Sequence, residues 1–308
     1  MASTSAEKVL IVGYGSIGKR HLGAFEAAGA EVAVVTQQDV THQKIYRDVS
    51  SAVVEYNPGI VVVANSTDKH LAALENLKLA GFKGIVLVEK PLADKVISFK
   101  HSFAGLYVAY NLRRSPLLTR LKEELKNREV VTAHVYCGQY LPGWRPQRDY
   151  REVYSAKKDQ GGGVLRDLSH ELDYTQWLFG NFEYLAAQGG HFSNLEIDSD
   201  DVFTLLGKTQ KSPHVVVSIN YLDRVARRTI LVHCQDATLF VDMVAGRLMI
   251  NSEVVLDNLK VADTYLEQAR SLIEGRTQSL SSFDDGMSVL KLIEAAEHSA
   301  QERKFINL

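Results

Sequence analysis

Residues 9–18 read Val-Leu-Ile-Val-Gly-Tyr-Gly-Ser-Ile-Gly. The four apolar residues predict a short buried strand, and apolar residues then recur at helical spacing as far as Gly29. A GxGxxG pattern predicts a dinucleotide site when it stands between a strand and a helix, as it does in this sequence. The pyrophosphate of the dinucleotide then accepts hydrogen bonds from the free N–H groups at the helix N-terminus. The glycines serve a tight turn, a close approach of the backbone to pyrophosphate, and close packing of the helix on the strand. The expected cofactor contacts are therefore Gly13, Tyr14, Gly15, Ser16, Ile17 and Gly18.

The form of the dinucleotide depends on the end of the next apolar run, residues 32–35. An acidic residue there selects the ribose diol of NAD, whereas a nearby arginine selects the 2′-phosphate of NADP. Thr36 and Gln37 follow the run instead, and Asp39 comes slightly late. Both side chains can hydrogen-bond either ribose, so the sequence predicts NAD or NADP without choosing between them.

Three further apolar runs, at residues 59–64, 84–88 and 106–109, read as buried parallel strands separated by helical segments. This alternation predicts right-handed crossovers and a doubly wound parallel sheet. Ligands bind at the carboxyl ends of such strands. The polar residues at these ends are expected to line the cofactor site, namely Asn65, Ser66, His70, Glu89, Lys90 and Asn111. Lys90 can act there as a hydrogen-bond donor or an acid, or it can be an ordinary solvated lysine.

The pattern changes at Glu129, where a long strand begins, and several β runs with few helices follow Gly161. This composition predicts a largely antiparallel open sheet with helices on one face. We therefore divide the chain into a Rossmann domain, residues 1–113, and an α+β domain for substrate binding and oligomerisation, residues 114–308. The last helix, around residues 285–301, carries a broad apolar face that can pack back on the first domain.

Residues 138–151 are polar, interrupted by prolines and rich in Trp, Tyr and Arg. Long irregular loops of this kind are usually functional. Arginine suits carboxylate or phosphate, and aromatic rings stack on sugars or bases. The predicted substrate contacts are Trp144, Arg145, Tyr150 and Arg151, although a surface loop or subunit contact is the alternative.

Residues 161–174 begin with three glycines and continue as a predicted helix. Arg166 is a further candidate for the substrate. Asp167 and His170 are three residues apart, so they are expected on one face of that helix, where the carboxylate can orient the imidazole as a base. The alternative is an aspartate that interacts with the helix dipole and a structural histidine.

The chain resembles the Gfo/Idh/MocA family of NAD(P)-dependent oxidoreductases in the order and spacing of four motifs. These are residues 13–18, Ala64-Asn65-Ser66 with His70, Glu89-Lys90-Pro91, and Tyr110-Asn111-Leu112-Arg113. The resemblance implies redox chemistry on sugars, inositols or sugar nucleotides, with Lys90 between nicotinamide and substrate and a Lys90–Pro91 bond that is often cis. It also implies a homodimer or homotetramer formed through the open sheet face of the second domain.

The family places its histidine four residues after the aspartate, where this chain has Glu171. His170 fits if one residue is missing, because Asp173 keeps its usual spacing from the histidine. Glu171 and Asp173 therefore remain candidate bases. This departure, with the Trp-Arg-Pro and Asp-Tyr-Arg stretches, resembles members from surface-polysaccharide or acidic-sugar gene clusters.

The composition excludes several classes of partner. A net charge of −2 over 308 residues gives no reason to expect nucleic acid or an anionic membrane as a partner.

The two cysteines, Cys137 and Cys234, form neither a disulfide framework nor a metal motif, so we expect buried thiols and no metal. Because the N-terminus has no signal-peptide pattern and no apolar run could span a bilayer, we expect a cytoplasmic protein.

The predicted function is hydride transfer between a nicotinamide and a secondary alcohol or ketone of a sugar, acidic sugar or nucleotide sugar. His170, oriented by Asp167, would take the hydroxyl proton, and Lys90 would stabilise the developing charge. One alternative is a dinucleotide sensor without catalysis. Another is a lyase-type family member that uses the nicotinamide transiently.

Overall fold

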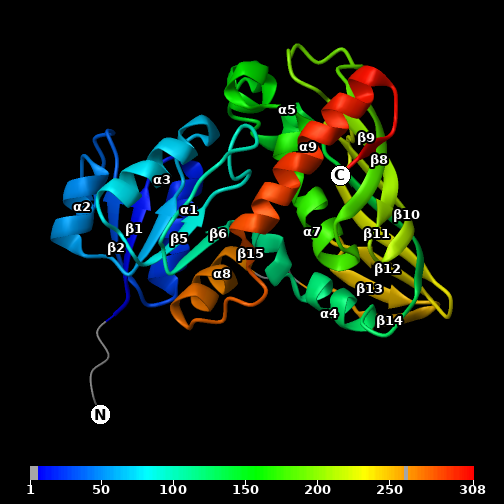
Figure 1. Ribbon diagram of the computed structural model, residues 1–308, viewed down its shortest axis with the longest axis horizontal. Coiled ribbons are helices and arrows are strands. Elements are labelled where there is room, and N and C mark those ends of the chain that lie inside the picture. The colour runs from blue at the N-terminus through cyan, green and yellow to red at the C-terminus, as the bar shows by residue number, and fades with distance from the viewer. Residues whose placement is uncertain (1–5, 260–262) are drawn as a thin grey trace. The chain divides into compact units, whose positions relative to one another are not determined.

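A computed structural model describes residues 6–259 and 263–308, and its chain divides into two compact units. The first unit contains the chain up to Arg114 together with Asp263–Met287, and the second begins at Ser115 and includes Ser288–Leu308. The division predicted from the sequence assigns the whole of Asp263–Met287 to the second domain. The structure differs because this segment supplies a helix and a short strand to the core of the first unit (Figure 1).

The first unit is built on a seven-stranded sheet in the order β15-β6-β5-β4-β1-β2-β3, parallel except for β15. The strands are β1 (Lys8–Val12), β2 (Glu31–Val35), β3 (Ile45–Tyr46), β4 (Ile60–Val63), β5 (Ile85–Val88), β6 (Gly105–Val108) and β15 (Ser281–Ser282). The chain runs outward from β1 in both directions, so the crevice between the β1 and β4 ends is the place where such sheets bind ligands. The predicted doubly wound parallel sheet is confirmed.

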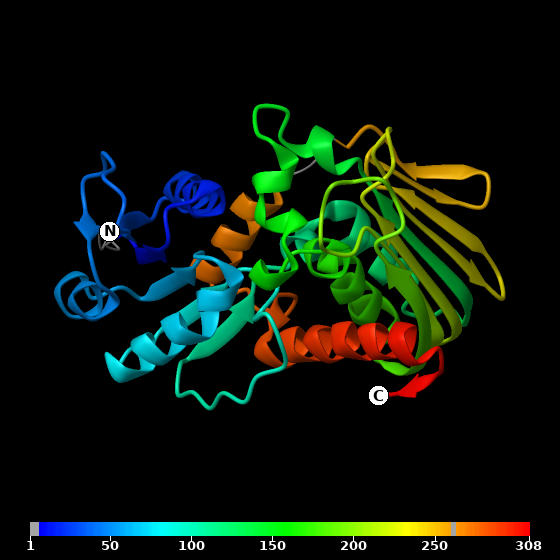
Figure 2. The same cartoon turned by 90° about the horizontal axis from the view of Figure 1, so that it is seen from above.

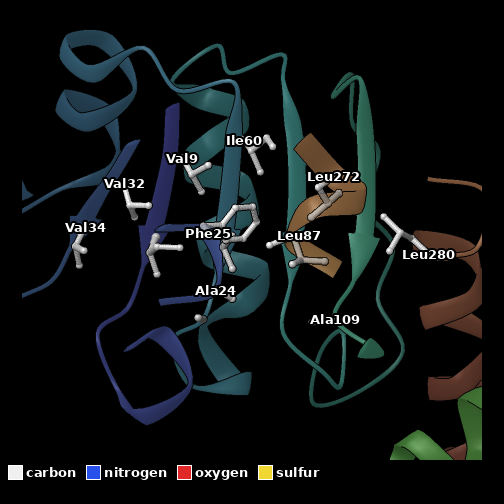
Figure 3. Close-up of a cluster of buried hydrophobic side chains, with 14 residues drawn as sticks. Val9, Ala24, Phe25, Val32, Val34, Ile60, Leu87, Ala109, Leu272 and Leu280 are labelled. Carbon is white, nitrogen blue, oxygen red and sulfur yellow. The ribbon is translucent and has the colours of Figure 1, made fainter. Parts of the chain in front are cut away.

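Helices cover this sheet and close its core. They are α1 (Ser16–Ala27), α2 (Val49–Tyr56), α3 (His70–Leu79) and α8 (Thr264–Ile273), with 3-10 turns η1 (Thr67–Lys69) and η2 (Asn111–Arg114). Figure 3 shows Phe25 of α1 and Leu272 of α8 among strand residues such as Val9 and Leu87, all of them buried. Strands buried on both faces need continuous apolar runs, which explains why these strands consist almost entirely of Val, Ile and Leu.

The second unit contains a nine-stranded sheet in the order β14-β13-β12-β11-β7-β10-β9-β8-β16. Its strands are β7 (Val130–Gly138), β8 (Phe182–Gly190), β9 (Val202–Thr209), β10 (Ser212–Asn220), β11 (Arg227–Cys234), β12 (Thr238–Asp242), β13 (Arg247–Ile250), β14 (Glu253–Leu256) and β16 (Ile306–Asn307). Every pair of neighbouring strands is antiparallel except the pair formed by β7 and β10, which is parallel. The predicted open, largely antiparallel sheet is confirmed.

The helices of the second unit lie along one face of this sheet, as Figure 2 shows for the described part of the chain. They are α4 (Pro116–Glu124), α5 (Leu141–Trp144), α6 (Val164–Asp167), α7 (Ser169–Phe179) and most of α9 (Phe283–Glu302), with 3-10 turns η3 (Tyr150–Glu152), η4 (Tyr154–Ala156) and η5 (Lys158–Gln160). Strand residues alternate between buried positions under the helices and half-buried positions on the opposite face. Among residues 6–259 and 263–308, the helices are too short or too polar to span a bilayer.

The prediction of one helix carrying both Asp167 and His170 is wrong. Asp167 ends α6, Leu168 leaves the helical conformation (φ −96°, ψ 29°), and His170 lies in the first turn of α7. Leu168 is itself buried, so its packing holds the break in place. The three-residue spacing therefore does not put the two side chains on the same face of a continuous helix.

Candidate active site

The glycine turn after β1 is fixed by its own backbone. Gly13 has φ 104°, and a Cβ there would lie 2.7 Å from the backbone nitrogen of Asn65. A Cβ on Gly18 would lie 2.1 Å from the Gly13 carbonyl oxygen. Gly15 differs, because none of the described atoms beyond its own chain neighbours lies within 4 Å of the position its Cβ would take. The fold thus requires Gly13 and Gly18, whereas Gly15 leaves an open face beside the helix that follows.

This open face suits the phosphates of a dinucleotide. Gly15 is the N-cap of α1, and neither a capping side chain nor an acidic residue occupies the first turn. The helix end therefore offers N–H groups and a positive dipole end, with no carboxylate in that turn to repel an anion. Nearby, the side-chain oxygen of Asn65 is buried without a hydrogen-bond partner in the described chain. An orphaned acceptor at a strand end is what a bound ligand would satisfy.

His70 holds the backbone at this edge of the sheet. Its Nδ1 lies 3.1 Å from the Pro91 carbonyl oxygen, and its Nε2 lies 3.2 Å from the Asn65 carbonyl oxygen. The side chain is buried, and this burial lowers its pKa although Glu89 opposes the shift. A neutral ring carries a single N–H, so His70 donates to only one of these carbonyl oxygens and packs against the other, between the loop after β4 and the segment after Lys90. Ser66, next to that loop, is exposed.

Glu89, at the end of β5, is buried and anionic. Its Oε1 lies 2.7 Å from Nε2 of His21, and its Oε2 accepts the backbone N–H of Lys90 at 3.0 Å. Burial alone would raise the pKa of Glu89, but the hydrogen bond and charge of His21, together with Lys90, lower it below its usual value. Lys90 itself is half-buried, and the Lys90–Pro91 bond is cis.

No motif in the sequence marks His21 as part of this arrangement. It occurs on the packed face of α1, three residues after Gly18, where its regular spacing made it look like a core position. A titratable side chain inside an otherwise apolar helix face is the signal that could have singled it out.

Two other predicted cofactor residues are bound within the first unit. Asn111 is buried, and its amide donates to the hydroxyl of Thr264 at 2.8 Å. Thr36 is also buried, and its hydroxyl accepts the Gln38 N–H at 3.1 Å, whereas Gln37 is exposed. Asn111 and Thr36 therefore hydrogen-bond within the protein interior, whereas the side chain of Gln37 is exposed to solvent.

Asp167 lies at the centre of a polar cluster in the second unit. The Tyr221 hydroxyl donates to its Oδ2 at 2.7 Å, and the Tyr154 hydroxyl also hydrogen-bonds this carboxylate. Burial, reinforced by the charge of Asp167, raises the pKa of Tyr221 well above the ordinary value. Tyr154 is 40% exposed as a residue, but the surroundings of its hydroxyl and the charge of Asp167 raise its pKa in the same direction. Two uncharged hydroxyls thus converge on a carboxylate that is 6% exposed.

The structure distinguishes the candidate bases by their burial. Glu171 is fully buried, with Oε1 2.8 Å from Nε of Arg228 and 3.2 Å from the Tyr174 hydroxyl. Asp173 is buried as well, whereas His170 is half-buried. A carboxylate in an interior ion pair is poorly placed to exchange protons with a substrate, so among the three His170 is the accessible one.

The loop after β7 forms one-turn helices rather than an irregular chain. The Trp144 ring packs edge-on against Tyr221 with centroids 5.2 Å apart, and its buried Nε1 has no hydrogen-bond partner among the described residues. Tyr150 accepts the Glu196 N–H through its hydroxyl at 3.2 Å. Arg145 is exposed.

Two of the predicted arginines form ion pairs within the second unit. Arg151 contacts Asp149 at 2.6 Å and Glu196 at 3.1 Å, and Arg166 contacts Glu297 at 2.5 Å. Their charges are thus partly balanced by neighbouring carboxylates.

Across residues 6–259 and 263–308, no group of three or more His, Cys, Asp or Glu side chains is arranged to hold a metal ion.

Comparison with protein families matches both halves of the chain. Residues 7–104 match a model described as an oxidoreductase family with an NAD-binding Rossmann fold, and residues 120–240 match the GFO/IDH/MocA C-terminal domain. The chain belongs to the Gfo/Idh/MocA family of oxidoreductases. The predicted family and its enzyme class are confirmed.

Solved structures share the fold of this Gfo/Idh/MocA oxidoreductase over 98% of its length. Levoglucosan dehydrogenase in complex with NADH has 18% identity and a TM-score of 0.83, with 99% of that chain covered. GenD2 from gentamicin A biosynthesis, in complex with NAD, has 19% identity, a TM-score of 0.80 and 96% coverage. An oxidoreductase from Agrobacterium radiobacter, in complex with NAD+, L-tartaric acid and magnesium, has 16% identity, a TM-score of 0.81 and 98% coverage. A search of curated protein sequences gave no match.

Proposed function

We propose that this oxidoreductase transfers a hydride between a nicotinamide and a carbon bearing a secondary hydroxyl of a sugar, acidic sugar or nucleotide sugar. The bound cofactor supplies the ring carbon that accepts or donates the hydride. The proposal is carried by the hydrogen bond at the end of β5, in which the buried, anionic Glu89 accepts the backbone N–H of Lys90. Sugar chemistry is supported by family membership and by similarity to levoglucosan dehydrogenase.

Lys90 is proposed to hydrogen-bond the reacting oxygen and stabilise its developing negative charge. An ammonium group is suited to this role because it offers three N–H donors and a positive charge. Its backbone is held by Glu89, and the following segment is held by the contact of His70 with the Pro91 carbonyl oxygen. A donor on a fixed backbone loses little freedom when the substrate binds.

His170 is proposed to take the hydroxyl proton during oxidation and to return it during reduction. Its partial exposure supports this role, and the burial of Glu171 against Arg228 speaks against the glutamate as base. Asp167 is proposed to orient His170 and, through its bonds to Tyr154 and Tyr221, to keep the surrounding elements in position.

Trp144 and Arg145 are proposed as direct substrate contacts. Trp144 has a buried ring N–H that a sugar hydroxyl could satisfy, and exposed Arg145 can bind an anionic group. Tyr150, Arg151 and Arg166 are proposed to contribute as well. Because both arginines are already paired with carboxylates, their contribution to binding should be smaller than that of Arg145.

The open face of the nine-stranded sheet is proposed to form a homodimer or homotetramer. One row across this face joins Leu206, Val216, His134, Leu231 and Phe240 through the strand registers. All five are at least partly exposed, with Leu206 at 39%. Sedimentation of the wild type and Leu231→Glu tests this, because a charge in the row should shift the protein toward monomer.

The experiment for the catalytic proposal is a turnover screen of sugars, acidic sugars and nucleotide sugars with both cofactors, followed by nicotinamide absorbance. Net oxidation or reduction with one of these substrates supports it. A sensor would bind the dinucleotide without any change in its redox state. A lyase-type enzyme would form product, detected by mass spectrometry, without net cofactor consumption.

A further inference from the structure

Arg47 lies beside the end of β2, the strand end that contacts the adenine ribose of the cofactor in Rossmann domains. It directly follows β3, which pairs in parallel with β2 so that Tyr46 aligns with Val35. Its Nη1 donates to the Thr36 carbonyl oxygen at 3.1 Å and to the Gln38 carbonyl oxygen at 3.0 Å. The guanidinium is therefore anchored on the turn after β2, although the sequence around that turn contains no arginine.

The remaining partner of this guanidinium can be exchanged. Arg47 Nη2 lies 3.0 Å from Oδ1 of Asp39, and the side chains are 54% and 100% exposed, respectively. Such an exposed ion pair contributes only about 0–1 kcal/mol. A phosphate with nearly two negative charges accepts stronger, charge-assisted hydrogen bonds from arginine. It would therefore replace Asp39 on Nη2 while Nη1 stays on the two backbone carbonyls.

We propose that Arg47 binds the 2′-phosphate of the adenine ribose, so that the protein binds NADP(H) more tightly than NAD(H). This inference rests on the proposed function, since it concerns the cofactor of the same site. In Rossmann domains the end of β2 meets the ribose, and an arginine there accommodates the 2′-phosphate. Residues 32–38 contain no carboxylate that would select the ribose diol instead.

Asp39 is the competing candidate for ribose recognition. If Asp39 bound the ribose diol of NAD, its substitution would weaken the binding of NADH. In the arrangement proposed here, Asp39 only competes with the phosphate for Arg47 and repels it. Asp39→Asn should then tighten NADPH binding and leave NADH unchanged, so this substitution separates the two readings of the strand end.

Isothermal titration of the substrate-free protein with NADPH and NADH tests the proposal directly. Wild-type protein should bind NADPH about tenfold or more tightly than NADH, and Arg47→Gln should lose that difference while its NADH affinity changes less than about twofold. The fragments 2′,5′-ADP and ADP should show the same contrast. Lys44→Gln is the matched control, because Lys44 is an exposed cation in the same segment that pairs with Glu31.

Two results would overturn the inference. One is NADH binding as tightly as NADPH in the wild type, and the other is an Arg47→Gln variant that keeps the wild-type preference. Both leave the proposed dehydrogenase function intact, since NADH would still bind. Failure of both dinucleotides to bind would instead overturn the proposed function together with this inference.

Discussion

The imidazole Nε2 of His21 lies 2.7 Å from Oε1 of Glu89, and both side chains are buried. His21 belongs to α1, which follows the glycine turn, and Glu89 fixes the backbone N–H of Lys90. The ring of Tyr265 packs edge-on against His21 with centroids 5.1 Å apart. One carboxylate thus links the helix proposed to bind the pyrophosphate to the proposed catalytic lysine.

Removing this carboxylate should destabilise the first unit. We expect Glu89→Ala to cost about 1–3 kcal/mol in the free energy of unfolding, because it leaves the buried imidazole of His21 without its hydrogen-bond partner. Urea denaturation measures the change. The control is Glu26→Ala, which removes a half-exposed carboxylate 3.8 Å from His42 and should cost less than about 1 kcal/mol. Equal losses in the two variants would contradict the structural role of the His21–Glu89 pair.

The three glycines of the turn should respond differently to alanine. Gly13→Ala and Gly18→Ala should destabilise the protein, because the new Cβ meets backbone atoms 2.7 and 2.1 Å away. Gly15→Ala should leave the melting temperature nearly unchanged and weaken dinucleotide binding by about tenfold, since only Gly15 opens onto the proposed phosphate site. Thermal melts and titration calorimetry separate the two effects.

Gly23→Ala is the control for this series, because Gly23 lies inside α1 with open space around its Cβ position. It should stabilise the helix by about 0.5–1 kcal/mol without altering cofactor affinity. A Gly15→Ala variant that binds the dinucleotide as well as Gly23→Ala does would argue against the phosphate site.

Glu171 should prove structural rather than catalytic. Arg228→Met alone leaves a buried carboxylate unpaired and should cost about 3–5 kcal/mol, whereas the double variant with Glu171→Gln should recover most of that loss. The double variant should also keep turnover within about tenfold of wild type, because His170 remains. Loss of turnover in a folded double variant would return Glu171 to the role of base.

The pH dependence of stability should carry a contribution from His70. Burial lowers its pKa below the ordinary value of 6.5, so the unfolded chain takes up a proton more readily than the folded protein as the pH falls below that value. Stability should therefore be lost on acidification, with a slope of at most about 1.4 kcal/mol per pH unit from this group. Denaturation of His70→Gln should show a shallower slope than wild type, while the exposed His298→Gln should not.

The sequence predicts the first unit well because its signals are local. Buried parallel strands require apolar runs such as residues 60–63, and the glycine turn requires Gly13 and Gly18 at fixed offsets. The partners of His21 and of Arg47 could not be predicted in the same way. Each contact depends on which strand or helix lies beside which, and that arrangement is not encoded in a local pattern.

The second unit shows the same limit in its helices. Leucine spacing continues through residues 164–172, so it gives no warning that the helix breaks at Leu168. The burial of Glu171 depends on Arg228, which comes from a strand much later in the chain. Both features decide which side chain is accessible as a base, and neither is encoded in a local sequence pattern.

Turnover of Lys90→Met, measured with the best substrate and cofactor from the turnover screen, decides whether Lys90 takes part in the chemistry. Methionine keeps an unbranched side chain but removes the charge and the donors. We predict that turnover falls by about 100-fold or more while the calorimetric affinity for the dinucleotide changes little. A folded Lys90→Met protein that turns over within about tenfold of wild type would contradict the proposed mechanism.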